Sequence, residues 1–163
     1  SNYSKISGLE FDGYYDFGVF NHFKKSYKVF FNATKMFEYD DYIANINPAL
    51  PDTSSKSRHV ADLSFGGGFE YDDFKNWNFR ISTRYVGKRN YVNFNDTTSP
   101  TKYRSQPVEY PPYMTVDVVV GYTFYKHHNF SLRVSNLTDE NYYELRYQPM
   151  PGRFNSLRYT YKF

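Results

Sequence analysis

A strict alternation of apolar and polar residues at the carboxyl end restricts the chain to β structure. Between Leu157 and Phe163 every second residue is apolar or aromatic, and the residues between them are polar. A period of two describes a β-strand with one apolar face and one polar face. The same alternation recurs through most of the upstream sequence, so we predict an all-β chain of about seven antiparallel strands.

The expected strands are separated by stretches rich in Gly, Pro, Asn, Asp and Ser. They cover about residues 6–17, 26–39, 58–71, 77–88, 114–125, 129–136 and the stretch after Gly152. The fourth strand alternates most sharply, with Phe79 and Ile81 on one face and Arg80 and Ser82 on the other. In the second strand Lys35 falls on the apolar face, which predicts a bulge or a shifted register.

The connections between these strands alternate in length. Short connections are expected at 18–25, 72–76 and 126–129, and long ones at 40–57, 89–113 and 137–152. Tight turns on one side and long loops on the other are typical of an up-and-down transmembrane β-barrel. Seven strands are an odd number and leave two edges, which hydrocarbon does not tolerate. We therefore expect an incomplete barrel segment.

Two motifs precede the final strand and narrow the class of barrel. Asn136-Leu137-Thr138-Asp139 begins the last long connection, and Pro151-Gly152-Arg153 ends it. Together with the strand that ends at Phe163, they resemble the carboxyl end of TonB-dependent outer-membrane receptors. In that family the terminal aromatic residue is a signal for barrel assembly.

The resemblance implies that residues 1–163 are the C-terminal portion of a TonB-dependent receptor barrel of about 22 strands, which surrounds an N-terminal plug. It places the protein in the outer membrane of a Gram-negative bacterium. The implied partners are membrane lipid, the plug, the remaining strands, and the TonB complex acting through the missing N-terminal part. The implied function is energised uptake of a scarce ligand, foremost a ferric siderophore.

Ligand-binding residues are expected in the long loops, because Arg and Tyr side chains suit anionic ferric chelates. The loop from Arg89 to Tyr113 contains four prolines that restrict its backbone, and it is longer than a simple connection requires. The candidate ligand-binding residues are Tyr91, Tyr103, Arg104, Tyr110, Arg146 and Tyr147.

Composition excludes several other classes of protein. The mean hydropathy of -0.76 and the absence of a long apolar run exclude a helical membrane protein, but not a barrel. The formal net charge of +3 is small and dispersed, which argues against nucleic-acid binding. The sequence has no cysteine, and its four histidines show no metal-ligand spacing. We expect no catalytic residues, no metal and no cofactor.

Two alternatives share the alternating pattern. A soluble antiparallel sandwich or lipocalin-like barrel would turn the apolar face inward, and would have to bury many of the 19 Tyr and 16 Phe residues. Another outer-membrane barrel, such as an autotransporter translocator or a porin, would share the final strand but not the two motifs. If the apolar face contacts lipid, the opposite face, with Arg80, Arg133 and Arg158, lines a wet lumen.

Overall fold

The computed structural model describes residues 2–45, 49, 53–93, 106–145 and 148–163, and for 91–93 and 106–108 only the backbone. The chain forms two compact units. The first contains Ser1–Glu10, Thr34–Ser64 and Val86–Pro112, and the second contains Phe11–Ala33, Phe65–Tyr85 and Tyr113–Phe163. Among the described residues, no helix has the length and apolar character needed to cross a membrane.

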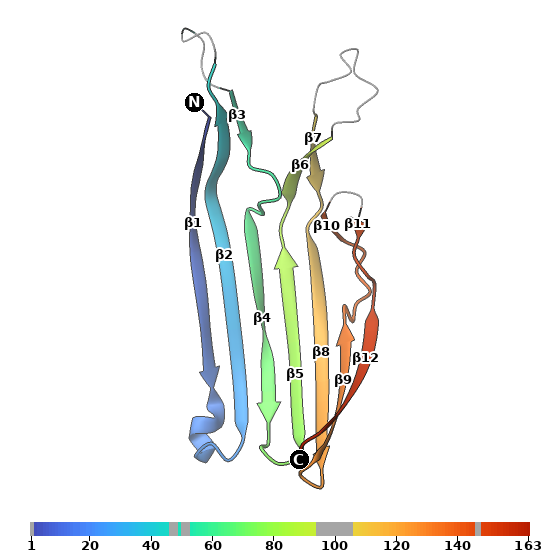
Figure 1. Cartoon of the computed structure of the whole chain (residues 1–163). Helices are drawn as coiled ribbons and strands as arrows, with labels where there is room; N and C mark the ends of the chain where they lie inside the picture. Colours follow the sequence, from blue (N-terminus) through green and yellow to red (C-terminus); the bar gives the residue numbers. More distant parts are fainter. Residues whose placement is uncertain (1, 46–48, 50–52, 94–105, 146–147) are drawn as a thin grey trace. The chain divides into compact units, whose positions relative to one another are not determined.

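One sheet contains most of the strands, and its order follows the sequence. The order is β1-β2-β4-β5-β8-β9-β12, with β3 added beside β2. Two further hairpins, β6-β7 and β10-β11, form in the long connections (Figure 1). The bounds are β1 Tyr3–Asp16, β2 Ser26–Ile43, β3 Thr53–Lys56, β4 Leu63–Asp72, β5 Trp77–Val86, β6 Arg89–Asn93, β7 Gln106–Tyr110, β8 Tyr113–Phe124, β9 His128–Ser135, β10 Tyr143–Leu145, β11 Gln148–Pro149 and β12 Phe154–Tyr161.

The prediction of an all-β, antiparallel, up-and-down segment of about seven strands is confirmed, and the barrel does not close within this chain. Several strand boundaries differ from the prediction: the first strand begins at Tyr3, the second extends to Ile43 and the fourth ends at Val86. The predicted strand 58–71 starts only at Leu63, because His59 adopts a left-handed φ of 61° and donates its N–H to the carbonyl of Asn90. The ambiguous Lys35 forms an ion pair with Asp62, with Nζ and Oδ2 3.6 Å apart.

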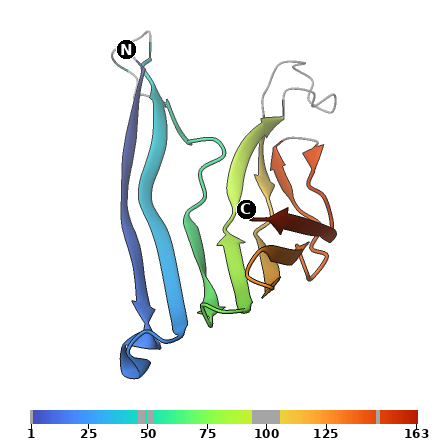
Figure 2. The same cartoon turned by 60° about the horizontal axis from the view of Figure 1, so that its bottom comes forward.

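The register of the last three strands of the sheet aligns their faces as the alternation predicts. Val120, Leu132 and Leu157 are direct partners across β8, β9 and β12. The next row on the same face is aromatic, with Tyr122, Phe130 and Tyr159. The three strands follow one another in the order of the sheet, which Figures 1 and 2 show from two directions. A continuous apolar surface therefore extends across them.

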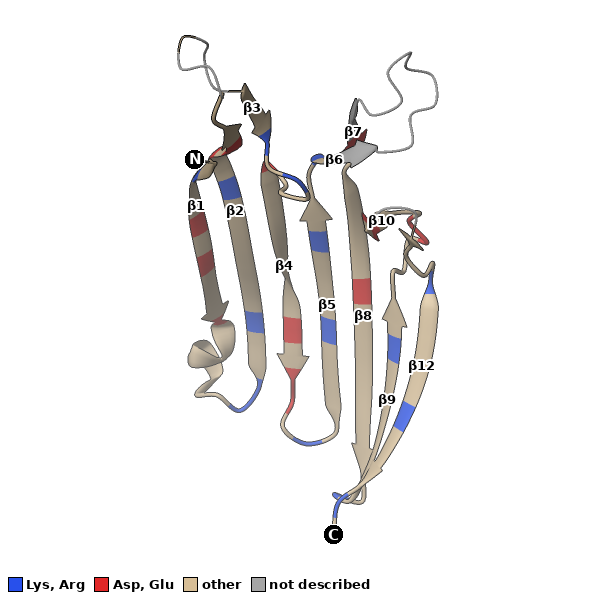
Figure 3. Ribbon diagram, turned by 45° about the horizontal axis from the view of Figure 1, so that its top comes forward, with Lys and Arg blue, Asp and Glu red and all other residues tan. Residues whose placement is uncertain are grey.

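The charged residues of these strands lie on the opposite face. Arg133 is the direct partner of Ser156, and Arg158 is the direct partner of Ser131. In Figure 3 β8, β9 and β12 are uncharged over most of their length. The separation of apolar and charged residues between the two faces therefore persists through the paired strands.

Three short turns lie together at one end of the second unit (Figure 1). The first contains a five-residue 3-10 helix, Phe17–Asn21, and Asp16 accepts hydrogen bonds there from Gly18 N, Tyr27 N and Ser26 Oγ. In the second, Asp73 Oδ1 accepts from three backbone N–H groups, those of Lys75, Asn76 and Trp77. The third follows Phe124. Aspartate therefore fixes the geometry of two of these turns.

Candidate ligand-binding loops and polar face

The hairpin of β6 and β7 contains most of the predicted binding residues. Its strands pair from Arg89↔Tyr110 to Asn93↔Gln106. Lys88 Nζ lies 2.9 Å from Glu109 Oε1, and Ala61 forms a bridge with Arg89. The base of this hairpin is therefore fixed to the rest of the first unit.

Arg89 and Tyr110 form the centre of that base. Arg89 is 7% exposed and Tyr110 is 6% exposed. The Arg89 guanidinium lies 5.5 Å from the centre of the Tyr110 ring, within the range of a cation–π interaction. Arg and Tyr are the residue types that were expected to bind a ligand. At the base of this hairpin, however, both side chains are buried and anchor the loop.

The other predicted residues are placed as follows. Tyr91 lies in β6, where only the backbone is described. Tyr103 and Arg104 lie outside the described residues, between β6 and β7. Arg146 and Tyr147 also lie outside them, between β10 and β11. These six residues thus belong to two separate hairpins, one in each unit.

A polar and aromatic cluster at the base of the second hairpin was missed by the sequence analysis. Glu144 Oε1 accepts a hydrogen bond from the Tyr113 hydroxyl at 3.1 Å and lies 3.0 Å from Arg84 Nη1. The rings of Tyr113 and Tyr142 stack with their centres 4.2 Å apart. The periodicity indicated that Arg84 faces away from the apolar surface, but it gave no signal for a partner 60 residues later.

The two motifs of the last connection act together as a structural clasp. The side chain of Asn136, which is 4% exposed, accepts from Glu140 N and donates to Glu140 O, both at 2.9 Å. Asp139 Oδ1 accepts from Arg153 N at 2.7 Å. A Cβ on Gly152 would lie only 2.6 Å from that same Oδ1. The motifs therefore join the end of β9 to the start of β12.

The polar face of the second unit carries a ladder of alternating charge across β1, β2, β4 and β5. Lys28 Nζ lies 5.7 Å from the centre of the Tyr14 ring and 3.6 Å from Glu70 Oε2. Glu70 Oε1 lies 2.7 Å from Arg80 Nη1, and Arg80 also lies over the Phe30 ring at 4.7 Å. The ladder is half exposed, so its contribution to stability in water is small.

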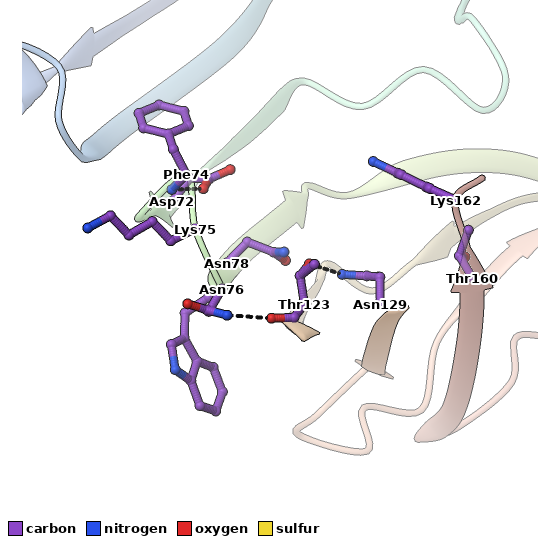
Figure 4. Close-up of a pocket in the computed structure, with 10 residues that line it drawn as sticks. Asp72, Phe74, Lys75, Asn76, Asn78, Thr123, Asn129, Thr160 and Lys162 are labelled. Carbon is purple, nitrogen blue, oxygen red and sulfur yellow. Dashed lines mark hydrogen bonds between the residues drawn. The ribbon is translucent and has the colours of Figure 1, made fainter. Parts of the chain in front are cut away.

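A shallow polar cavity of about 470 Å³ lies near the short turns of the second unit (Figure 4). Asn76 Nδ2 donates to Thr123 O at 2.6 Å, and Asn129 Nδ2 donates to Thr123 Oγ1 at 2.9 Å. Gly121 leaves space for Asn78, because a Cβ there would overlap its amide group. The remaining lining residues are Asp72, Phe74, Lys75, Trp77, Thr160 and Lys162.

The histidines hold positions in turns and at strand ends. His127 Nδ1 lies 2.9 Å from the carbonyl oxygen of Lys162, and His128 Nδ1 lies 2.7 Å from the Tyr159 hydroxyl. Within the described part of the chain, no group of three or more His, Cys, Asp or Glu residues could hold a metal ion.

Comparison with known proteins gives one family. The model for the family described as TonB dependent receptor-like, beta-barrel, matches residues 1–137. The crystal structure of the siderophore receptor PirA from Acinetobacter baumannii is similar in fold, with a TM-score of 0.69 and 20% sequence identity. That similarity covers 98% of this chain and 22% of the PirA chain. No match is found among curated proteins.

Proposed function

The chain belongs to the TonB-dependent receptor β-barrel family, and from this premise we propose that it forms part of an outer-membrane receptor that takes up a scarce ligand. The observation that carries the proposal is the family match over residues 1–137, joined to a seven-strand order that follows the sequence. The chain spans about a fifth of the length of PirA. The plug, the other strands and the TonB complex are thus partners contributed outside these residues.

The ligand that fits the available chemistry best is an iron–siderophore complex. Ferric chelates are commonly anionic and carry planar aromatic groups, so they favour guanidinium and phenol side chains. Tyr91, Tyr103, Arg104 and Tyr110 place such groups along the β6–β7 hairpin, and Arg146 and Tyr147 place them between β10 and β11. The similarity to the siderophore receptor PirA supports the same ligand class.

The buried base of the β6–β7 hairpin supports a binding role for the loop above it. The contact of Arg89 with Tyr110 and the ion pair of Lys88 with Glu109 hold the base of the loop. A loop with a fixed base loses less conformational entropy on binding a ligand than a loop between free strands. We assign Tyr110 to the base that supports the proposed site, with Tyr103 and Arg104 in the segment that contacts ligand. This division follows from the 6% exposure of Tyr110.

The test is a full-length receptor in which residues 94–105 are replaced by Asn-Gly. Asn93 and Gln106 are direct partners, so a two-residue turn joins them without disturbing β6 and β7. Binding of a ferric siderophore to cells that display the variant is expected to weaken at least about tenfold, which equals roughly 1.4 kcal/mol.

A second variant serves as the matched control for loop length. It keeps twelve residues between β6 and β7 but replaces all of them with Gly and Ser. Loss of binding in both variants would assign the effect to the loop side chains. Loss of binding only in the short variant would assign the effect to the length of the loop. Unchanged binding in both variants, with surface display verified by protease accessibility, would move the ligand site to other loops.

The family match argues against the alternatives of an autotransporter translocator, a porin or a soluble barrel.

Growth of a receptor-deficient strain on single ferric siderophores tests the ligand class directly. Restoration of growth by the full-length receptor with at least one ferric siderophore is expected. Growth restored only by a ligand without iron would replace the ligand assignment and leave the receptor assignment intact.

A further inference from the structure

A carboxylate oxygen of the β10–β11 hairpin lies between two hydrogen-bond donors of the main sheet. Glu144 Oε1 lies 3.0 Å from Arg84 Nη1 and accepts a hydrogen bond from the Tyr113 hydroxyl at 3.1 Å. Arg84 lies near the end of β5, and Tyr113 begins β8, the neighbouring strand of the sheet. A guanidinium and a phenol hydroxyl that converge on one oxygen form a recognition pattern for carboxylates.

Packing fixes the two donors, whereas the carboxylate belongs to a small hairpin. Tyr113 is 4% exposed, and its ring stacks on that of Tyr142 with centres 4.2 Å apart. The Arg84 guanidinium lies 5.9 Å from the centre of the Tyr113 ring. β10 has three residues, and its pairing with the two-residue β11 contains a register shift. Because two-stranded hairpins are marginally stable, Glu144 moves away from the donors more easily than the donors move away from each other.

Arg84 remains accessible to solvent although it is paired. Its side chain is 60% exposed, and that of Glu144 is 31% exposed. By the alternation of β5, Arg84 shares the polar face with Arg80, and this face lines the lumen of a complete barrel. An ion pair as exposed as this one contributes little to stability in water, so a second carboxylate that arrives from the lumen replaces Glu144 at little cost.

The charge around the two donors favours a carboxylate over a more highly charged anion. Burial and then the carboxylate of Glu144 raise the pKa of Tyr142, and Asp117 acts in the same direction. Asp117 Oδ1 accepts a hydrogen bond from Asn136 N at 2.9 Å, so this second carboxylate is held in place. With Asp117 nearby, Arg84 offers little net positive charge to a phosphate dianion after Glu144 has moved.

We propose that Arg84 and Tyr113 form a carboxylate-binding subsite that Glu144 occupies when no ligand is bound. A carboxylate of the ligand displaces Glu144, takes over its two contacts and releases the β10–β11 hairpin from the ends of β5 and β8. This inference rests on the proposed function and narrows the ligand to iron chelates that carry a free carboxylate.

The test uses the full-length receptor, with citrate as the probe and inorganic phosphate at equal ionic strength as the comparison. Hydrogen exchange followed by mass spectrometry reports the release of β10, and its dependence on citrate concentration gives an apparent Kd. In the wild type we expect citrate to accelerate amide exchange in β10 by at least about threefold, and phosphate to leave it unchanged.

Variants of the three groups separate carboxylate binding from a structural role. Glu144→Gln removes the internal competitor, so citrate affinity should rise by about threefold to fivefold, and β10 should exchange fast without citrate. Arg84→Gln and Tyr113→Phe should also release β10, but both should weaken citrate binding, and Tyr113→Phe keeps the stacked ring. The matched controls are Arg80→Gln and Glu70→Gln, which remove an ion pair of the polar face with Nη1 and Oε1 2.7 Å apart. Both controls should respond to citrate as the wild type does.

Three results would overturn the inference. The first is β10 exchange that citrate leaves unchanged in the wild type, together with unchanged citrate affinity in Glu144→Gln. The second is an equal response to phosphate, which would indicate a general attraction of anions. The third is loss of the citrate response in Arg80→Gln as well as in Arg84→Gln.

The growth assay with single ferric siderophores separates this inference from the proposed function. Growth restored by a ferric siderophore in the absence of any citrate response would overturn the subsite alone. A citrate response that requires Arg84, in a receptor that restores growth with no ferric siderophore, would contradict the proposed function and support the subsite.

Discussion

Gly68 is the residue whose replacement tests the packing of β4 most directly. A Cβ at this position would overlap the carbonyl oxygen of Ile81 and would lie 2.7 Å from Phe30 Cζ and 2.9 Å from Ser82 Cα. We therefore expect Gly68→Ala to destabilise the full-length receptor by about 1–3 kcal/mol, as other overpacked sites do. Urea unfolding of the inserted receptor provides the measurement.

Gly13 of β1 is the matched control for that substitution. A Cβ there meets only the Phe11 ring, at 3.7 Å, which is ordinary contact. Gly13→Ala should leave stability unchanged or raise it slightly, because alanine restricts the unfolded chain. Equal losses at both positions would show that the effect reflects strand glycines in general rather than the close approach around Gly68.

Asp73 makes the turn between β4 and β5 sensitive to acid. Hydrogen bonds from the backbone N–H groups of Lys75, Asn76 and Trp77 hold the pKa of its carboxyl below the ordinary value of 3.8. Because this pKa is lowered by folding, the ionised carboxyl stabilises the folded turn fully at pH values above the pKa of the unfolded chain. The stabilisation is lost as the pH falls through the pKa of the folded state. Amide exchange at Asn76 and Trp77 should therefore accelerate, relative to Asp73→Asn at the same pH, between about pH 5 and pH 2. An identical pH profile in the two proteins would contradict this role.

At the scale of the strand, the two faces should respond differently to the same charged residue. Val118 belongs to the apolar face of β8, where it is the direct partner of Val134. If that face contacts lipid, Val118→Arg should cost about 2–4 kcal/mol near the middle of the bilayer. Ser82→Arg, on the predicted polar face of β5, should cost much less. Unfolding of the inserted receptor gives both values, and similar losses would refute the assignment of the faces.

At the scale of the whole molecule, the sheet ends in two strands that need partners. β1 and β12 are the two edge strands of the sheet. The hydrocarbon core of a bilayer has no groups that could form hydrogen bonds with a free strand edge. We expect the amides of β1 and β12 in the full-length receptor to exchange as slowly as those of β8. Hydrogen exchange followed by mass spectrometry measures this, and fast exchange in β1 or β12 alone would show an open edge.

The sequence by itself determined the number of main strands, their antiparallel order and the composition of the two faces. It could do so because strand periodicity is local, and because the register of β8, β9 and β12 follows from keeping apolar residues such as Leu132 and Leu157 on one face. The motifs around Asn136 and Gly152 were recognisable as a family pattern, but their spacing carried no information about their bonds.

Only the tertiary structure decided what joins distant segments. The ion pair of Arg84 with Glu144 connects residues 60 positions apart, and the clasp between Asp139 and Arg153 depends on close approach of two loops. The hairpins β6-β7 and β10-β11 also escaped prediction, since their short strands lack an alternating face. The left-handed φ angles of Phe23, Phe74 and Tyr125 were the least predictable feature, because local preference opposes them and only the surroundings of the folded turns select them.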